Sequence, residues 1–270
     1  TVMRYDYDRF DFLIRQETTQ GSETDVIYRV PDFVGNLFGT PDRKDRKYGA
    51  GGKLLEDPDC FYHYDDEGNL IFREFKQLQE TGVRYDRKRM EKERGIRCLA
   101  TGTGWLYEWA SNGMLKKVIR PDGRPVEFRY DALGRRTVKR YFGKTTRWVW
   151  NGNVPLHEWS YKAIGLQSDE EENIPPKEPV EDITTWVFEA GTFVPTAKIQ
   201  DGKQSSIVSD YLGTPIQMYD EKGYKTWECT LDIYGKVVNF EGFFLNDCPF
   251  RFQGQYEDKE TGLYYNRFRY

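Results

Sequence analysis

Hydrophobic and polar residues alternate along much of this chain, and aromatic side chains often occupy every second position. Trp105, Tyr107 and Trp109 show the pattern first. It recurs at Val126, Phe128 and Tyr130, at Trp148 and Trp150, and at Trp186 and Phe188. A period of two places such side chains on one face of a β-strand, whereas a helix would scatter them around its axis. The pattern therefore predicts strands with an aromatic face.

A short phrase repeats between these runs: an aromatic residue, three mostly polar residues and a glycine. Its structural repeat positions are Tyr64 and Gly68, Trp109 and Gly113, Tyr130 and Gly134, and Tyr219 and Gly223. The aromatic residues Tyr64, Tyr85, Trp109, Tyr130 and Trp150 follow one another at intervals of 21, 24, 21 and 20 positions. Two strands and two turns fill such an interval, and glycine suits a tight turn. The sequence thus predicts an all-β fold of reiterated antiparallel β-hairpins.

Three stretches interrupt the rhythm. Residues 42–47 and 85–95 are mixed charge runs, which are usually solvated faces, with binding of a phosphate-bearing ligand as the alternative. An acidic, proline-rich stretch at about 163–183 is typical of a surface loop. Strand patterning resumes at Thr184 with the same character, so residues 1–270 are expected to form a single domain.

Composition narrows the function classes. The chain has 17 Phe, 7 Trp and 19 Tyr, which predicts an aromatic core. Its 40 basic and 44 acidic residues give a net charge of -4, so the overall charge does not favour binding to nucleic acid. No apolar stretch is long enough for a membrane span. The four cysteines are far apart, which favours reduced structural thiols over a metal site.

The case for catalysis is weak. Asp57 and Asp59, or Asp65 and Asp66, are paired carboxylates, but each also suits a turn or a strand end. The two histidines, His63 and His157, have no serine or cysteine partner in a recognisable motif. We therefore assign no catalytic, cofactor-binding or metal-binding residue, and expect no cofactor.

Several ordered motifs resemble a known family. They include Val34-Gly35-Asn36-Leu37-Phe38, Tyr130-Asp131-Ala132-Leu133-Gly134-Arg135-Arg136, Thr185-Trp186-Val187-Phe188-Glu189, Asp210-Tyr211-Leu212-Gly213-Thr214-Pro215, Phe250-Arg251-Phe252-Gln253-Gly254-Gln255-Tyr256 and the stretch from Glu260 to Tyr270. In this order they resemble the core of the Rhs (rearrangement hotspot) or YD-repeat family of polymorphic toxins. The resemblance runs nearly the whole length of the chain.

The resemblance implies a wound β-sheet that forms part of a hollow shell, or cocoon, around a C-terminal toxin domain. The function expected is encapsulation of that effector for delivery to competing cells. The partners would be the enclosed toxin, the remaining shell and, in type VI secretion, a spike protein. The protein would be made in the cytoplasm and then secreted or delivered. This region would not be an enzyme, because the self-cleaving aspartyl protease motif and the toxin would lie downstream of Tyr270.

The alternative is a surface module that binds carbohydrate or a partner protein. Tryptophan rings stack well on sugars and are enriched at protein interfaces. The candidate residues are Trp105, Trp109, Trp148, Trp150 and Trp159. Burial of these rings would weaken this alternative.

Overall fold

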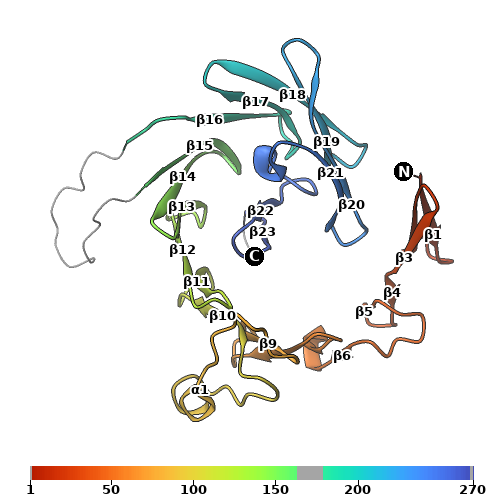
Figure 1. The fold of residues 1–270 in the computed structure, drawn as a ribbon, viewed down its shortest axis with the longest axis vertical. Helices are drawn as coiled ribbons and strands as arrows, with labels where there is room; N and C mark the ends of the chain where they lie inside the picture. Colours follow the sequence, from red (N-terminus) through yellow and green to blue (C-terminus); the bar gives the residue numbers. More distant parts are fainter. Residues whose placement is uncertain (1, 163–178, 268–269) are drawn as a thin grey trace. The chain divides into compact units, whose positions relative to one another are not determined.

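The computed structural model describes residues 2–162, 179–267 and 270 (Figure 1). Most of the predicted acidic loop, residues 163–178, therefore lies outside the described residues. The described chain is built mainly of antiparallel strands, which confirms the prediction of an all-β fold. No helix in this part of the chain is long and apolar enough to cross a membrane.

The chain forms two compact units. The first, the N-terminal unit, comprises Thr1–Tyr107, Pro121–Gly123 and Leu231–Lys236. The second, the C-terminal unit, comprises Glu108–Arg120, Arg124–Thr230 and Val237–Tyr270. The elements up to β10 are β1 (Val2–Tyr7), β2 (Leu13–Gln20), β3 (Glu23–Tyr28), β4 (Val30–Pro31), β5 (Leu37–Phe38), β6 (Lys47–Tyr48), η1 (Ala50–Gly52), β7 (Leu54–Glu56), β8 (Cys60–Tyr64), β9 (Leu70–Phe75), α1 (Arg87–Arg94) and β10 (Gly104–Trp109).

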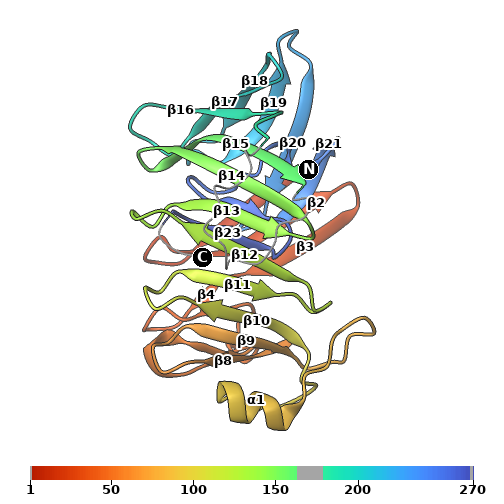
Figure 2. The same cartoon turned by 90° about the vertical axis from the view of Figure 1, so that its left-hand side faces the viewer.

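The later elements continue the series of strands. They are β11 (Leu115–Ile119), β12 (Pro125–Tyr130), β13 (Arg136–Tyr141), β14 (Lys144–Asn151), β15 (Val154–Lys162), β16 (Thr184–Phe188), β17 (Pro195–Gln200), β18 (Lys203–Ser209), β19 (Pro215–Asp220), β20 (Lys225–Leu231), β21 (Val237–Gly242), η2 (Leu245–Asp247), β22 (Tyr256–Asp258) and β23 (Leu263–Tyr265). Strands β6 to β21 are hydrogen-bonded neighbours in the order of the sequence. Figure 2 shows β11 to β15 lying side by side in that order.

The repeated phrase forms the turns between strands, and Asp131 shows how. Tyr130 ends β12, and the Asp131 carboxylate accepts hydrogen bonds from the backbone N–H groups of Leu133 at 3.0 Å and Arg135 at 2.9 Å. Gly134 has φ 75°, a left-handed conformation that glycine adopts without steric cost. Asp65, Asp210, Asp220 and Asp232 accept the equivalent backbone hydrogen bond four residues on. In the copies that carry an aspartate, its side chain therefore adds to the backbone hydrogen bonds of the turn, such as that from the N–H of Gly134 to the carbonyl of Asp131 at 2.9 Å.

The core of the C-terminal unit lies on one face of its strands. Val126 and Phe128 of β12 are 0% and 4% exposed, and Trp148 and Trp186 are 3% and 1% exposed. Glu127, between Val126 and Phe128, is half-buried, and Arg129, which follows Phe128, is exposed. This alternation matches the predicted aromatic face and gives the C-terminal segment described below a surface on which to pack.

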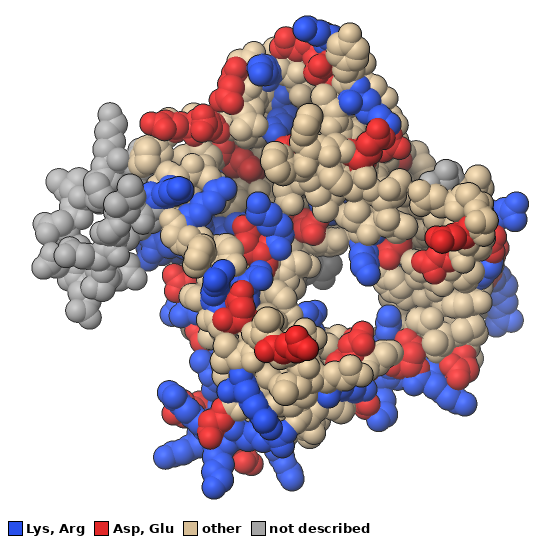
Figure 3. Space-filling model, viewed as in Figure 1, with Lys and Arg blue, Asp and Glu red and all other residues tan. Residues whose placement is uncertain are grey.

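In the N-terminal unit, residues 76–103 are inserted between β9 and β10, and α1 lies within them. The sequence predicted a break at 85–95 but not a helix. Asp86 caps its first turn by accepting from the N–H of Arg89 at 2.8 Å, and Gly95 ends it with φ 65°. Met90 is the buried residue of the helix, so its cations face solvent and gather at the lower left of Figure 3. A helix that is polar nearly all round carries no hydrophobic period from which to predict it.

A single buried carboxylate ties this insertion to the sheet. Glu74 of β9 is 0% exposed and accepts hydrogen bonds from the backbone N–H groups of Leu99, Ala100 and Gly102 at 2.7, 2.9 and 2.8 Å. His63 of β8 lies 3.1 Å from the same carboxylate. Burial alone would raise the pKa of Glu74, but these hydrogen bonds lower it to about 2. Glu74 is therefore an ionised anchor for the return of the chain into β10.

Candidate functional site: a buried clamp on the C-terminal segment

The residues after η2 fold back onto the strands of the C-terminal unit. Residues 248–267 and 270, called the C-terminal segment here, contain the short hairpin β22–β23, in which Tyr256 pairs with Tyr265 and Asp258 with Leu263. Phe250 forms an isolated bridge with Tyr256. The ring of Phe250 packs edge-to-face on Trp186 and Phe188, at centroid distances of 4.9 and 5.4 Å. The C-terminal segment has few strand pairs of its own, and aromatic contacts hold it against β16.

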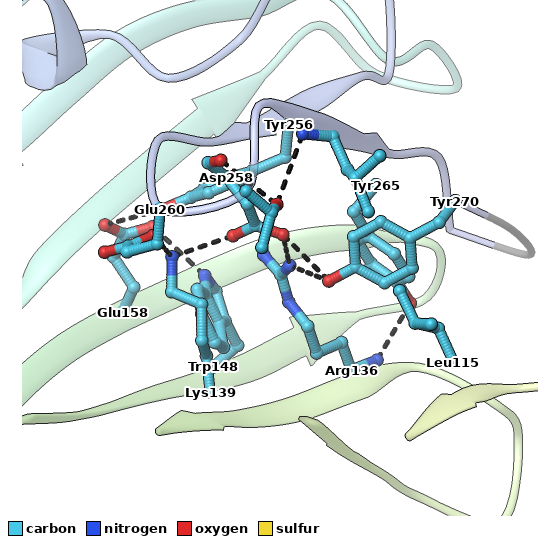
Figure 4. A network of polar contacts seen from close by, with 12 residues as sticks. Leu115, Arg136, Lys139, Trp148, Glu158, Tyr256, Asp258, Glu260, Tyr265 and Tyr270 are labelled. Atoms are coloured by element: carbon cyan, nitrogen blue, oxygen red, sulfur yellow. Dashed lines mark hydrogen bonds and ion pairs between the residues drawn. The ribbon is translucent and has the colours of Figure 1, made fainter. Parts of the chain in front are cut away.

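At its centre lies Asp258, with 0% exposure, among cations supplied by β13 (Figure 4). Its carboxylate accepts from Arg136 Nη1 and from Lys139 Nζ, the latter at 2.8 Å. Lys139 Nζ also donates to Glu260 at 2.7 Å, and the hydroxyl of Tyr270 donates to Asp258 at 2.8 Å. We call these five residues the Asp258 clamp. They join positions more than 100 residues apart in one buried ion network.

The guanidinium of Arg136, 1% exposed, also lies among five aromatic rings. The distances from its Cζ to the ring centroids are 4.1 Å for Trp148, 4.6 Å for Tyr265, 5.0 Å for Tyr256, 5.8 Å for Tyr270 and 5.9 Å for Phe128. Ring faces attract a cation most strongly where water is excluded. Burial alone would lower the pKa of Arg136, but the charge of Asp258 and the phenol oxygens of Tyr270 and Tyr256 raise it above its ordinary value.

A second carboxylate, that of Glu158 on β15, accepts hydrogen bonds from three aromatic side chains of the site. It accepts from the indole N–H groups of Trp148 at 3.1 Å and Trp186 at 3.2 Å. The hydroxyl of Tyr256 donates to its other oxygen at 3.3 Å. Since buried indole and phenol groups need hydrogen-bond partners, Glu158 fixes how these rings face the C-terminal segment.

The end of the segment is attached to the start of β13. The backbone N–H of Arg136 donates to the hydroxyl of Tyr265 at 2.8 Å, and that hydroxyl donates to the carbonyl of Arg267 at 2.9 Å. Arg267 Nε donates to Asn153 in the turn between β14 and β15 at 3.0 Å. The segment is consequently held at both its hairpin and its end. Among the residues that the structure describes, no group of His, Cys, Asp or Glu is arranged to hold a metal ion.

Comparison with known proteins shows the family of this chain. The RHS Repeat family model matches residues 111–146, which include Arg136 and Lys139 of the clamp. Double-stranded DNA deaminase toxin A of Burkholderia cenocepacia is 30% identical over 254 residues, covering 88% of this chain. Toxin protein Tse5 of Pseudomonas aeruginosa is 31% identical over 228 residues, covering 82% of this chain. The chain belongs to the Rhs/YD-repeat family of polymorphic toxins.

This Rhs chain spans 16% of the length of each of these two relatives. Among solved structures, the Tc holotoxin pore of Photorhabdus luminescens aligns over 98% of this chain and 16% of its own, with 17% identity and a TM-score of 0.45.

The Rhs repeat residues named from the sequence lie in turns rather than in the clamp. Tyr64, Trp109 and Tyr130 end strands, and Gly68, Gly113 and Gly134 have positive φ in the turns that follow. Tyr219 lies next to the end of β19, with Gly223 in the turn. Asp57 and Asp65 accept backbone hydrogen bonds in turns, as their alternative role predicted.

The clamp itself was missed by the sequence analysis. Arg136, Glu260 and Tyr270 carried the family resemblance without a role, and Lys139 and Asp258 were not singled out. One sequence signal could have pointed to the clamp. Residues 256–270 are rich in tyrosine and acidic residues, whereas elsewhere in the chain aspartate mostly occurs together with glycine in turns. Arg136 is 122 positions from Asp258, so no local pattern links the two.

The clamp predicts a dependence of stability on pH. Burial alone would raise the pKa of Asp258, but the charges of Arg136 and Lys139 lower it below its ordinary value. A lowered folded-state pKa stabilises the fold above the unfolded pKa, about 3.9, and this contribution is lost as the pH falls further. The measurement is the midpoint of urea unfolding, followed by tryptophan fluorescence. When the pH is lowered from 5 to about 3, we expect this midpoint to decrease more in the wild type than in Asp258→Asn. Equal changes in the two proteins would contradict the assignment.

Proposed function

We propose that this chain is a wall segment of an Rhs shell that encloses a C-terminal toxic effector domain. The observation that carries the proposal is the unbroken sequence order of β6 to β21 in one sheet. A wall made in this way leaves few unpaired strand edges, and exposed edges are where β proteins pair with other chains. The clamp supports the same role because it secures the C-terminal segment against the sheet, ahead of the proposed cargo.

In this proposal residues 1–270 act as one non-enzymatic region. The partners are the rest of the shell and the effector that follows, with delivery to competing cells by secretion, type VI secretion being the expected route. The two curated toxins named above support a toxin assignment, and their greater length leaves room for the remaining shell and the effector.

The carbohydrate-binding alternative has less support in the structure. Trp148 is buried, and Trp105, Trp109, Trp150 and Trp159 are half-buried. Trp148 and Trp150 also donate their indole N–H groups within the unit, to Glu158 and to the carbonyl of Arg136. None of the five candidate tryptophans is therefore fully exposed, which leaves less ring surface for a sugar.

Limited proteolysis of the full-length gene product tests the shell. One variant carries a specific protease site within the proposed effector, and a matched variant carries the same site in the exposed turn at Ser111–Gly113. We expect the turn site to be cut and the effector site to be cut at least 10-fold more slowly, a difference of about 1.4 kcal/mol in local opening. The effector expressed alone should be cut quickly. Equal cutting of both sites in the full-length protein would refute enclosure.

A further inference from the structure

Six turns of this chain have the sequence Asp-x-x-Gly, and only the aspartate and the glycine are needed for their geometry. In the turn at 210–213, the Asp210 carboxylate accepts from the N–H groups of Leu212 and Thr214, both at 2.9 Å, and Gly213 has φ 80°. The two side chains between aspartate and glycine take no part in this geometry. Since turns lie at the surface, polar residues are expected at these middle positions unless a partner covers them.

The middle positions of the six turns fall into two groups. Two turns carry charged pairs, and four carry apolar or aromatic pairs: Asp66-Glu67 and Glu221-Lys222 in the first group, and Phe33-Val34, Ala132-Leu133, Tyr211-Leu212 and Ile233-Tyr234 in the second. Apolar members of the second group are strongly exposed, with Phe33 at 98%, Tyr211 at 90% and Leu133 at 65%. Exposed apolar pairs at positions that the turn does not require are typical of interaction sites.

One of the four apolar turns is already bound within the N-terminal unit. The hydroxyl of Tyr234 donates to the backbone carbonyl of Tyr28, at the end of β3, at 2.7 Å. The guanidinium carbon of Arg46 lies 5.5 Å from the centroid of the Tyr234 ring, and Arg46 Nη1 donates to the carbonyl of Leu37 at 2.7 Å. The tyrosine of this turn is therefore bound by an oriented arginine and a backbone carbonyl of the same wall, and only 36% of it stays exposed.

Tyr211 is the other tyrosine at the middle of such a turn, and it belongs to the C-terminal unit. Its side chain is 90% exposed, and its neighbour Leu212 is 55% exposed. Among the residues that the structure describes, the Tyr211 hydroxyl has no hydrogen-bond partner and no cation lies over its ring. The turn thus presents the same kind of side chain as Tyr234 without the groups that bind it.

The backbone that carries Tyr211 is closely packed beneath the exposed ring. A Cβ on Gly213 would lie 2.7 Å from Cγ2 of Val194 and 2.6 Å from Nε2 of Gln253, so these side chains contact the turn directly. Together with the aspartate hydrogen bonds, this packing fixes the position of the turn. A side chain presented by ordered backbone loses less conformational entropy when a partner binds.

We infer that the turn at 210–213 docks on another segment of the Rhs shell wall. That segment places an arginine over the Tyr211 ring and a backbone carbonyl within reach of its hydroxyl, as Arg46 and Tyr28 do for Tyr234. Tyrosine and arginine are the side chains that most often dominate the binding energy of protein interfaces, and a guanidinium over a ring adds a cation–π attraction. This contact rests on the proposed function, because its partner belongs to the remaining shell.

Photo-crosslinking in the full-length gene product tests the contact. One variant carries p-benzoylphenylalanine in place of Tyr211, which keeps an aromatic ring there, and the matched control carries it in place of the exposed Lys222 of a charged turn. Mass spectrometry identifies the crosslinked peptides. We expect position 211 to crosslink several times more than position 222, within one chain, to a wall segment outside residues 1–270. Equal yields, or a crosslink from position 211 to the effector, a second copy or another protein, would overturn the inference.

Hydrogen exchange in the same full-length protein gives a second readout. In Tyr211→Ser the amide of Thr214, which donates to Asp210, should exchange at least about tenfold faster, because an undocked turn opens more often. Lys222→Ser is the control, and the equivalent amide of Tyr224 should change by less than about threefold. Unchanged exchange at Thr214 would contradict docking. Slow cutting of the effector without the crosslink would reject this contact and keep enclosure, and fast cutting with the crosslink would do the reverse.

Discussion

Asp258→Asn is expected to loosen the hairpin β22–β23 from the sheet by about 3 kcal/mol, near the lower end of the cost of breaking a buried ion pair. The asparagine keeps the shape of the side chain but removes its charge. Arg136 and Lys139 would then remain buried without their main counterion. Hydrogen exchange of the amides of Tyr256–Asp258 and Leu263–Tyr265 should accelerate roughly 100-fold at neutral pH, because each 1.4 kcal/mol is a factor of ten.

Glu241→Gln is the matched control. Glu241 also pairs with a lysine, Lys225 at 2.8 Å, but its side chain is 70% exposed. Loss of this exposed pair should cost less than about 1 kcal/mol. A further variant combines Asp258→Asn with Arg136→Met, which leaves an apolar side chain among the five rings. Replacing both partners should recover much of the loss, since the uncompensated cation is gone. Wild-type exchange rates in Asp258→Asn, or no recovery in the double variant, would argue against a clamp.

The hairpin architecture could be predicted because its determinants are local. In Tyr130-Asp131-Ala132-Leu133-Gly134, the strand end, the capping carboxylate and the left-handed glycine lie within five consecutive residues. The period-two aromatics then fix which face is buried. Helix α1 could not be predicted in this way. Its ends are defined by Asp86 and Gly95, but only Met90 within it is buried, so no apolar period marks the residues between them.

The clamp depends on contacts between residues distant in sequence. In the sequence, Arg136 is an ordinary charged residue that follows a turn. Only the structure shows that it binds Asp258. Sequence reasoning therefore recovers the repeating unit of this fold but not the place where the chain departs from the repeat, which is where the clamp lies.

Glu74 offers the second large expected effect, in the N-terminal unit. Glu74→Gln is nearly isosteric, but it turns one acceptor oxygen into an N–H₂ group that faces backbone donors. Leu99, Ala100 and Gly102 all donate to this carboxylate, so at least one backbone N–H group loses its partner. Hydrogen bonds to a charged group contribute about 1.5–3 kcal/mol each, and we expect a loss of about 2–4 kcal/mol.

The loss should be local to the insertion that carries α1. Gly104, which begins β10, has no room for a side chain, since a Cβ would lie 2.0 Å from the carbonyl oxygen of Arg73. The backbone there fits the sheet closely, and Glu74 fixes the approach to it. In Glu74→Gln the amides of residues 99–102 should exchange at least about 30-fold faster, as expected for a loss of 2 kcal/mol. Glu93→Gln on α1 removes only an exposed pair with Arg89 and serves as the control.

The pH dependence separates this anchor from a simple packing effect. Because the pKa of Glu74 is lowered to about 2 from an ordinary value of 4.5, its stabilisation is complete above about pH 4.5 and is lost as the pH falls toward 2. Exchange at residues 99–102, corrected for the intrinsic rate at each pH, should therefore accelerate in the wild type on acidification from pH 5 to about pH 2.5. In Glu74→Gln it should already be fast at pH 5 and change little. If the wild type and the variant respond alike, the carboxylate charge does not hold the insertion in place.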